Sequence, residues 1–375
     1  MKVFSMIVQH LAIQNAIHQS HLFMRNSFSS VFGFQNDYNV SYQKVTMPYS
    51  KGIYIGNTVY ENFKASCPIY LSLTFNPIFL VVEKSSFAHC ENGDLGGAIY
   101  FKNYGGGIIL DKICAYCCFC YGLSINAGQV ARIHLFSNEQ VRINTTSITK
   151  CPSSYLDKDT REPISIFFGD LIVNQANFSK NYLKYTSAMY TWNLQGCLMS
   201  FSSFKEGFAS ISILLRLTSA LSSNIHWIKK VNFVLNQSPG TGSAIISSGN
   251  VQTNISECIF IDNYGALFTC TDPLTSMTIH NNYFKLIPQF PIFQATVNVR
   301  TSNNVQTSVY TQTIPYAHFF TYYCDVEYQQ LNVEETICPA IPPSPTACDG
   351  ELPDESNLFS VIKFVIPFIH FIYHI

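Results

Sequence analysis

The chain has 375 residues, of which 47% are hydrophobic and only 12% are charged. That charged share is about half of the roughly 25% usual in soluble domains, which argues against a surface built from amphipathic helices and favours an all-β protein. Lys and Arg number 22 against 23 Asp and Glu, and the longest basic run is Lys229-Lys230. This balance predicts no nucleic-acid partner.

Residues 1–50 are interpreted as an N-terminal segment or cap. Met1-Lys2 and the apolar run from Val3 to Val8 follow the order of a signal peptide. The run ends at Gln9, however, and is shorter than the seven to fifteen apolar residues of a typical signal core. A weak signal peptide is therefore left open at this end.

Residues 51–300 contain a repeat in which Phe follows a small or polar residue and Asn or Cys comes three positions after the Phe. The clearest copies are centred on Phe87, Phe178, Phe233 and Phe260. Weaker copies are centred on Phe63, Phe119, Ile148, Phe204 and Phe284, and successive anchors lie 24 to 32 residues apart. A small residue, Ala and an aliphatic residue often follow, as in Gly97-Ala98-Ile99, Ser243-Ala244-Ile245 and Gly265-Ala266-Leu267.

This spacing predicts coils that pair edge to edge and bury their side chains only by stacking. The predicted fold class is all-β: a right-handed parallel β-helix, a single-stranded solenoid, with a C-terminal apolar helix. Phe and Ile would point inward. Asn at the bend would adopt unusual backbone angles, bond neighbouring peptide groups and pair with the Asn of the next coil. A β-sandwich array or another solenoid is the alternative.

Gly105-Gly106-Gly107 is interpreted as a turn between strands, because no Lys-Ser/Thr follows it as in a phosphate-binding loop. The chain has 13 cysteines, an odd number, and four of them cluster at Cys114, Cys117, Cys118 and Cys120. Cys114 and Cys117 have the spacing of metal ligands, but no second such pair follows. Stacked or disulfide-bonded cysteines are favoured, with Cys114, Cys118 and Cys120 on one face of an extended strand.

Two polar clusters are candidate sites. Asp157 and Asp159, near Arg161 and Glu162, form the best acidic-basic cluster, and a solvated loop is the favoured interpretation. The second cluster consists of His226, Trp227, Lys229 and Lys230. It is a candidate sugar-binding ledge, and a strand-edge turn is the favoured interpretation.

Five Asn-x-Ser/Thr sequons occur, at Asn39, Asn144, Asn177, Asn236 and Asn254. Their number is what the Asn, Ser and Thr content alone would produce, so they do not indicate secretion. Asn177 and Asn236 lie at predicted bends, where a structural role is the alternative to glycosylation.

The C-terminal end loses the repeat. Residues 301–338 include Cys324 and Cys338 and are interpreted as a cap, and residues 339–357 as a Pro-rich linker. Residues 358–375 are almost wholly apolar; as a helix they would span about 27 Å, close to the thickness of a hydrocarbon core. We therefore expect a membrane-anchoring helix. A lipid-anchor signal cleaved near residues 347–350 and a buried apolar tail are the alternatives.

The run Gly96-Gly97-Ala98-Ile99, followed by Phe-x-x-Asn-like segments, resembles the repeats of chlamydial polymorphic outer-membrane proteins. It is similar also to right-handed β-helix repeat surface proteins of protists. The resemblance covers about residues 55–300. It implies a surface-exposed, adhesive solenoid, and it assigns no site residues.

The sequence therefore predicts a non-enzymatic β-helix scaffold for adhesion or ligand binding. It would lie on the extracellular face of the cell surface, held in the membrane by residues 358–375, with an unknown protein or carbohydrate ligand. No catalytic, cofactor-binding or metal-binding residue is assigned. The alternative is a carbohydrate-active β-helix enzyme, a pectate-lyase-like lyase or a glycoside hydrolase, which would need carboxylates clustered on adjacent coils. A cytosolic or virion-type structural solenoid, with reduced cysteines, is a third interpretation.

Overall fold

The computed structural model describes most of the region between Tyr38 and Gln306. The described residues are 38–40, 52–64, 67–73, 76–93, 95–121, 128–136, 139–152, 161–217, 225–240, 243–270, 272–285, 287, 291–294 and 298–306. They form strands, turns and bends without a helix, and the strands build about seven turns of a parallel β-solenoid. The prediction of an all-β parallel solenoid is confirmed.

The predicted linker (339–357) and anchoring segment (358–375) lie outside the described residues, as do residues 307–338 of the predicted cap and nearly all of residues 1–50. No helix within the described ranges has the length and apolar character needed to cross a membrane.

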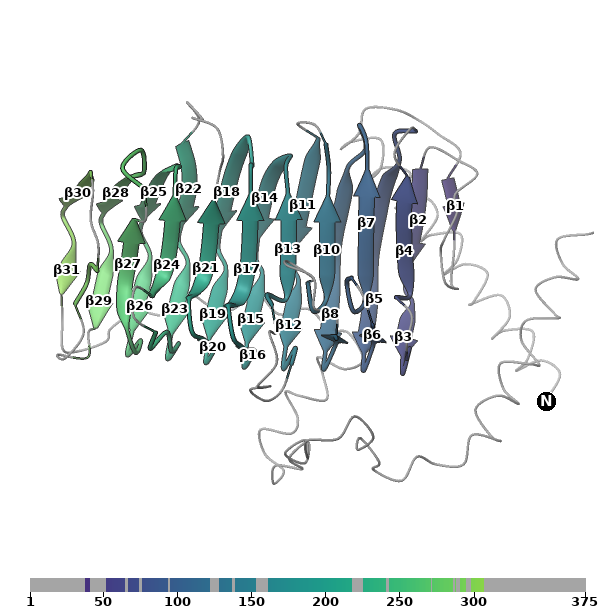
Figure 1. The fold of residues 1–375 in the computed structure, drawn as a ribbon, viewed down its shortest axis with the longest axis horizontal. Coiled ribbons are helices and arrows are strands. Elements are labelled where there is room, and N and C mark those ends of the chain that lie inside the picture. Colours follow the sequence, from purple (N-terminus) through teal and green to yellow (C-terminus); the bar gives the residue numbers. More distant parts are fainter. Residues whose placement is uncertain are drawn as a thin grey trace, which may run out of the picture. The chain divides into compact units, whose positions relative to one another are not determined.

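One wall of the solenoid is an eight-stranded parallel sheet to which each coil contributes one strand (Figure 1). Each strand pairs only with its counterparts in the preceding and following coils. The strands are β4 (Ile69–Leu73), β7 (Ile99–Asn103), β10 (Ala131–His134), β13 (Ile164–Phe167), β17 (Thr186–Trp192), β21 (Ser212–Leu217), β24 (Ala244–Gly249) and β27 (Ala266–Cys270).

A nineteen-stranded sheet forms the rest of the solenoid and bends once, which divides it into a long arm and a short arm. Two strands run through the bend: β5 (Phe79–Ala88) and β8 (Ile108–Tyr116). The other strands of the long arm are β1 (Tyr38–Val40), β2 (Gly52–Gly56), β11 (Gln140–Asn144), β14 (Asp170–Asn174), β18 (Gly196–Ser200), β22 (Ile225–Lys229), β25 (Gln252–Ser256), β28 (Ser276–His280) and β30 (Val299–Ser302).

The short arm has strands of two or three residues. They are β3 (Val59–Glu61), β12 (Ser147–Thr149), β15 (Asn177–Ser179), β19 (Ser203–Lys205), β23 (Asn232–Val234), β26 (Ile259–Ile261), β29 (Tyr283–Lys285) and β31 (Val305–Gln306). Two small pairs complete some coils: β6 (Glu91–Asn92) with β9 (Phe119–Cys120), and β16 (Tyr182–Leu183) with β20 (Phe208–Ala209).

The interior is filled by in-register columns of apolar side chains. The short arm carries the main column, in which each anchor pairs with the anchor of the next coil: Phe87, Ala115, Ile148, Phe178, Phe204, Phe233, Phe260 and Phe284. Ring centroids lie 5.2 Å apart from Phe178 to Phe204 and 4.9 Å from Phe233 to Phe260. These distances match the roughly 4.8 Å spacing of neighbouring strands, so stacking and backbone pairing reinforce each other.

Seven of the nine predicted anchors occupy this column, and two predictions were wrong. In the first coil, Tyr60 rather than Phe63 pairs with Phe87, and Phe63 packs edge-on against Tyr60. In the third coil, Ala115 takes the position expected for Phe119. Phe119 instead lies in β9, after the next bend, where it pairs with Glu91.

Along the short arm, each strand from β5 to β26 is flanked on either side by one residue with positive φ. Before the strands lie Lys84, Lys112, Thr145, Gln175, Phe201, Lys230 and Glu257, and after them His89, Cys117, Lys150, Lys180, Glu206, Leu235 and Asp262. A left-handed residue at each corner turns the chain sharply while both flanking strands keep their pairing. Since most of these residues are not glycine, each corner carries a cost of about 1–2 kcal/mol that the stacked coils must offset.

The Asn residues predicted at the bends lie one position after the left-handed residues that follow the short strands. Their side chains form a ladder between coils. Asn236 Oδ1 accepts the Gly207 N–H at 3.0 Å, and Asn236 Nδ2 donates to Phe204 O at 2.8 Å and to Asn263 Oδ1 at 3.0 Å. A second ladder before the short strands joins Asn282 to Asn304 at 3.0 Å. The predicted pairing of Asn side chains is confirmed.

The predicted backbone role of these Asn residues was wrong. Leu235 and Asp262, and not the Asn residues that follow them, have positive φ. The Asn side chain is needed for its amide, which satisfies peptide groups of the preceding coil, and the bend itself is made by the preceding residue.

Cysteines replace Asn in the same ladder on the earlier coils. Cys118 Sγ donates to Phe87 O at 3.4 Å, and Cys151 Sγ accepts the Cys118 N–H at 3.2 Å. Cys90 and Cys118 are free and buried, and so is Cys151. Burial and the thiol of Cys118 raise the pKa of Cys90 and Cys151 well above the usual range.

The predicted common face of Cys114, Cys118 and Cys120 was wrong. A bend at Cys117, where φ is 49°, separates β8 from the residues that follow. Cys118 joins the interior cluster, Cys120 lies in β9, and Cys114 is disulfide-bonded.

Glycine is required where the chain turns against a neighbouring coil. Gly105-Gly106-Gly107 lies between β7 and β8, so the predicted turn is confirmed. A Cβ on Gly106 would collide with the Ile78 carbonyl oxygen, and one on Gly97 with the Gln129 carbonyl oxygen. The contact at Gly97 explains why a small residue precedes β7 of the eight-stranded sheet, and the contact at Gly106 does the same for β8 of the nineteen-stranded sheet.

Candidate functional site

Polar side chains form one row where the long arm ends, and each is in register with the next coil. The row, here called the polar row, contains Glu83, Asp111, Asn144, Asn174, Ser200, Lys229, Ser256, His280 and Ser302. Neighbouring parallel strands lie about 4.8 Å apart, so consecutive members can touch. Any chemistry shared between coils on this side of the solenoid would therefore arise here.

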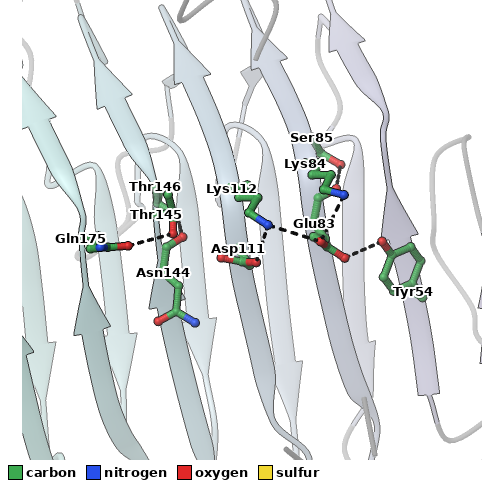
Figure 2. Close-up of polar contacts among 10 residues, drawn as sticks. All are labelled: Tyr54, Glu83, Lys84, Ser85, Asp111, Lys112, Asn144, Thr145, Thr146 and Gln175. Atoms are coloured by element: carbon green, nitrogen blue, oxygen red, sulfur yellow. Dashed lines mark hydrogen bonds and ion pairs between the residues drawn. The ribbon is translucent and has the colours of Figure 1, made fainter. Parts of the chain in front are cut away.

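Glu83 is the most enclosed charged member of the row, with 3% of its surface exposed. The Tyr54 hydroxyl donates to Oε2 at 2.8 Å, whereas Oε1 accepts no hydrogen bond. Two ammonium groups compensate its charge at longer range: Lys84 Nζ lies 3.8 Å from Oε1 and Lys112 Nζ 4.0 Å away. Figure 2 shows Glu83 between Tyr54 and Lys112.

Asp111 lies beside Glu83 on the next coil, in direct register. Burial and the neighbouring Glu83 carboxylate raise the pKa of Asp111, while Lys112 and Lys84 oppose the shift. The Lys112 ammonium lies 3.9 Å from Asp111 Oδ2 and so bridges both carboxylates (Figure 2). Asp111 therefore holds a proton more readily than a free aspartate does.

Two carboxylates on adjacent coils meet one requirement of the predicted enzyme alternative. Catalysis by paired carboxylates also requires both groups to reach the scissile bond. Glu83 Oε1 is shielded from solvent, while the Asp111 side chain is 26% exposed. Unless its neighbours move, the pair presents one accessible carboxylate, and that arrangement suits a packing role better than acid–base exchange.

Further along, members of the polar row and of the adjacent corner bond to one another. Ser200 donates to Asn174 Oδ1 at 3.2 Å, and Thr145 donates to Gln175 Oε1 at 3.4 Å. Within the described ranges, no group of three or more His, Cys, Asp or Glu side chains has the arrangement of a metal site. The polar row is thus chiefly a coil-to-coil connection.

The predicted acidic-basic cluster is only partly described, because Asp157 and Asp159 lie outside the described residues. Glu162 is buried, which corrects the expected solvated loop at this position. The Ser165 hydroxyl donates to its carboxylate, and burial raises the pKa of Glu162. The Arg161 guanidinium stacks 3.6 Å from the ring centroid of Tyr185.

The predicted sugar-binding ledge is also partly assembled. On β22, His226 is buried whereas Trp227 and Lys229 face outward, as the alternation of the strand requires. Glu257, which the sequence pattern did not connect to this site, lies 3.0 Å from Lys229 and 3.6 Å from Lys230. Its hydrogen bond with Lys229 lowers the pKa of Glu257.

Exposed apolar side chains surround Trp227 on the outer face of the long arm. Leu198 is in register with Trp227, and Ile172 with Leu198. Leu198, Ile225 and Trp227 are 42%, 43% and 40% exposed. We call these three residues the apolar patch; contiguous exposed apolar surface of this kind marks interaction sites.

The pairing of Glu83 with Asp111 was missed in the sequence, where the two residues are 28 positions apart. Glu83 lies four residues before the anchor Phe87, and Asp111 lies four residues before Ala115. Since Ala115 is not aromatic, the anchor pattern placed this coil at Phe119, and the shared offset was hidden. If Ala115 is taken as the anchor of this coil, Glu83 and Asp111 lie at the same distance before their anchors, and the sequence then predicts their pairing.

No protein-family model, no curated protein and no solved structure matches this chain.

Proposed function

We propose that this chain is a non-enzymatic binding scaffold on the extracellular face of the cell surface. In this proposal the solenoid is a right-handed parallel β-helix, and residues 358–375 hold it in the membrane as a helix. Its outer faces bind a protein or carbohydrate ligand. Right-handedness is favoured because about 98% of crossovers between parallel strands of one sheet have that hand.

The apolar patch is the observation that carries this proposal. Leu198, Ile225 and Trp227 lie on a sheet face that offers a flat, rigid surface, with Lys229 and Glu257 beside them. A rigid apolar centre with a charged rim is the usual composition of a binding surface.

The free cysteines are compatible with an extracellular location. Cys90, Cys118, Cys151 and Cys258 are free and buried. Burial keeps oxidants in the solvent away from these thiols, so they persist even in an oxidising compartment. Cys117 is partly exposed.

Labelling intact cells with a membrane-impermeant amine reagent tests the proposal. We expect modification of Lys229 and Lys230, which border the apolar patch, before the cells are broken. If these lysines react only after lysis, the surface location is wrong.

A carbohydrate-active enzyme is the second candidate, and the register of Glu83 with Asp111 favours it. Incubation of the purified chain with a polyuronide, followed by absorbance of the unsaturated product or by reducing-end release, measures this activity. Turnover that is lost in both Glu83→Gln and Asp111→Asn would replace the scaffold proposal. Absence of turnover, with a folded protein, supports the structural role of the pair.

A further inference from the structure

The outer face of the eight-stranded sheet differs in character from the apolar patch. Over β7, β10, β13 and β17 it gathers cations and aromatic rings from four successive coils. Lys102 is in register with His134, His134 with Phe167, and Phe167 with Trp192. We call this surface the basic-aromatic face; its members are Lys102, Arg132, Phe167, Tyr190 and Trp192, together with Arg161, which lies three residues before β13.

Both arginines of this face lie on aromatic rings. The Arg132 guanidinium lies 5.3 Å from the ring centroid of Phe167, and that of Arg161 lies 3.6 Å from the centroid of Tyr185. The Nε atom of each is buried and has no hydrogen-bond partner. Neither guanidinium forms an ion pair within the described part of the chain. Both arginines are partly exposed, so each presents a planar cation, held in place on a ring, to an anion from solvent.

Among the described residues, no ion pair balances the arginines of this face. Glu162 lies near both arginines, but it is buried and already accepts the Ser165 hydroxyl. Burial and the nearby positive charges of Arg132 and Lys102 lower the pKa of His134 to about 4. The imidazole is therefore neutral at neutral pH, and the net charge of the face comes from Lys102, Arg132 and Arg161.

The rings of this face pack against one another. Ring centroids lie 5.9 Å apart from Phe167 to Tyr190, whose planes are tilted by 53°, and 6.4 Å apart from Tyr190 to Trp192. Phe167 and Tyr190 are nearly buried, whereas Trp192 remains partly exposed. Trp192 is therefore the ring of this face that a ligand can reach, and a nucleobase cannot slip between rings that are already packed on the sheet.

We propose that the basic-aromatic face binds an acidic polysaccharide. Its carboxylate or sulfate groups pair with Arg132 and Arg161, and a sugar ring lies against Trp192. An extended polymer suits four coils in register better than a compact ligand does, and three cations are too few to follow a nucleic-acid backbone. The inference rests on the proposed binding role and names the ligand class for one face of it.

The two tryptophans of the chain make the test specific to a face, because Trp192 belongs to the basic-aromatic face and Trp227 to the apolar patch. The full chain is prepared as Trp227→Phe, which leaves Trp192, and as Trp192→Phe, which leaves Trp227. Each is titrated with polygalacturonate, with neutral galactan and with duplex DNA while tryptophan emission is recorded. We expect a saturable change with polygalacturonate in the variant that retains Trp192, and none with galactan.

Charge variants identify the residues that bind. In the Trp227→Phe background, Arg132→Gln and Arg161→Gln should each weaken polygalacturonate binding by at least about tenfold. Arg300→Gln, at an exposed arginine on β30, is the matched control and should change the affinity less than about twofold. Arg132→Lys should retain part of the affinity, and about 0.5 M salt should weaken binding in every variant.

Several outcomes would overturn the inference. Equal binding of galactan would remove the acidic requirement, and equal binding of DNA would reduce the effect to non-specific charge. A response of Trp227 alone would move the ligand to the apolar patch, overturning this assignment while leaving the binding role intact. No response at either tryptophan overturns the inference, while the labelling of intact cells separately decides the surface role.

Discussion

Asn236 shows why an amide is placed beside a bend in this solenoid. Its backbone turns no corner, yet its side chain makes three hydrogen bonds to the coils on either side. The carbonyl of Phe204 and the N–H of Gly207 are both enclosed by the stack and depend on this amide. The Asn236 amide is buried and fully hydrogen-bonded, so this residue has the structural role that was the alternative to glycosylation.

We predict that Asn236→Ala lowers the free energy of unfolding by about 2–4 kcal/mol, because it leaves a buried carbonyl and a buried N–H without partners. Urea unfolding followed by circular dichroism measures the change. Asn144→Ala, in the outward polar row, is the matched control and should cost less than about 0.5 kcal/mol. Equal losses in both variants would contradict the ladder as a source of stability.

His134 makes stability depend on pH in a defined window. Its pKa is about 4 in the fold against 6.5 for an ordinary histidine, so the fold favours the neutral ring. The contribution is therefore fully present above pH 6.5 and is lost as the pH falls toward 4, because the unfolded chain takes up the proton first. We predict that His134→Gln flattens this decline, which urea unfolding at pH 7.5 and at pH 5 would show.

Arg132→Gln is the companion variant for His134. Arg132 is the second cause of the lowered pKa, after burial, so its removal should raise the pKa of His134 toward the ordinary value. A titration of the imidazole proton by NMR measures this directly. If the wild type and His134→Gln lose the same free energy of unfolding between pH 7.5 and pH 5, another group causes the loss of stability in acid.

At the scale of the element, the bends matter as much as the strands. Each short strand is held between two left-handed corners, and one of these corners is Leu235, at a φ of 56°. A branched aliphatic residue is poorly suited to this conformation, and its side chain is largely exposed there. On the first coil the equivalent corner is Asn62, a residue that adopts the left-handed region readily.

We predict that Leu235→Asn raises the free energy of unfolding by about 1 kcal/mol, since it relieves backbone strain without removing buried surface. Val234→Asn is the matched control one position earlier, in β23, where Asn weakens a strand and should lower stability. Thermal unfolding of the two variants in parallel measures both effects. A loss of stability in Leu235→Asn would mean that its exposed side chain contributes contacts that outweigh the strain.

The elements that could be predicted from the sequence are those in which the repeat is regular. Phe178, Phe204, Phe233 and Phe260 lie in coils of similar length, and their spacing located four successive short strands. The earlier coils broke the pattern: Ala115 occupies an anchor position without an aromatic ring, and two nearby phenylalanines lie just beyond theirs. Periodicity fails where the side chain that fills a column changes size.

At the scale of the whole molecule, the membrane assignment rests on residues 358–375. We predict that a chain ending at Asn357 moves from the membrane fraction to the soluble fraction after cell breakage. The physical reason is that these 18 residues, most of them apolar, supply about one bilayer span, and nothing else in the prediction holds the protein there. Fractionation with an antibody to the solenoid measures this, with Lys363→Leu as a full-length control that should stay bound. A truncated chain that remains in the membrane fraction would refute the anchor.

The sequence by itself determined the repeat, the all-β class, the inward anchors and the Asn ladder, because each depends on side-chain type at a local spacing. Only the tertiary structure decided which distant residues meet. Tyr54, Glu83 and Asp111 share one corner, and Arg132 and Arg161 each lie over an aromatic ring of the following coil, because register between coils sets those neighbours. Coil lengths vary as loops lengthen and shorten, so no fixed offset in the sequence reveals that register. Pairing of backbone with backbone fixes it, and the surfaces available for function follow from it.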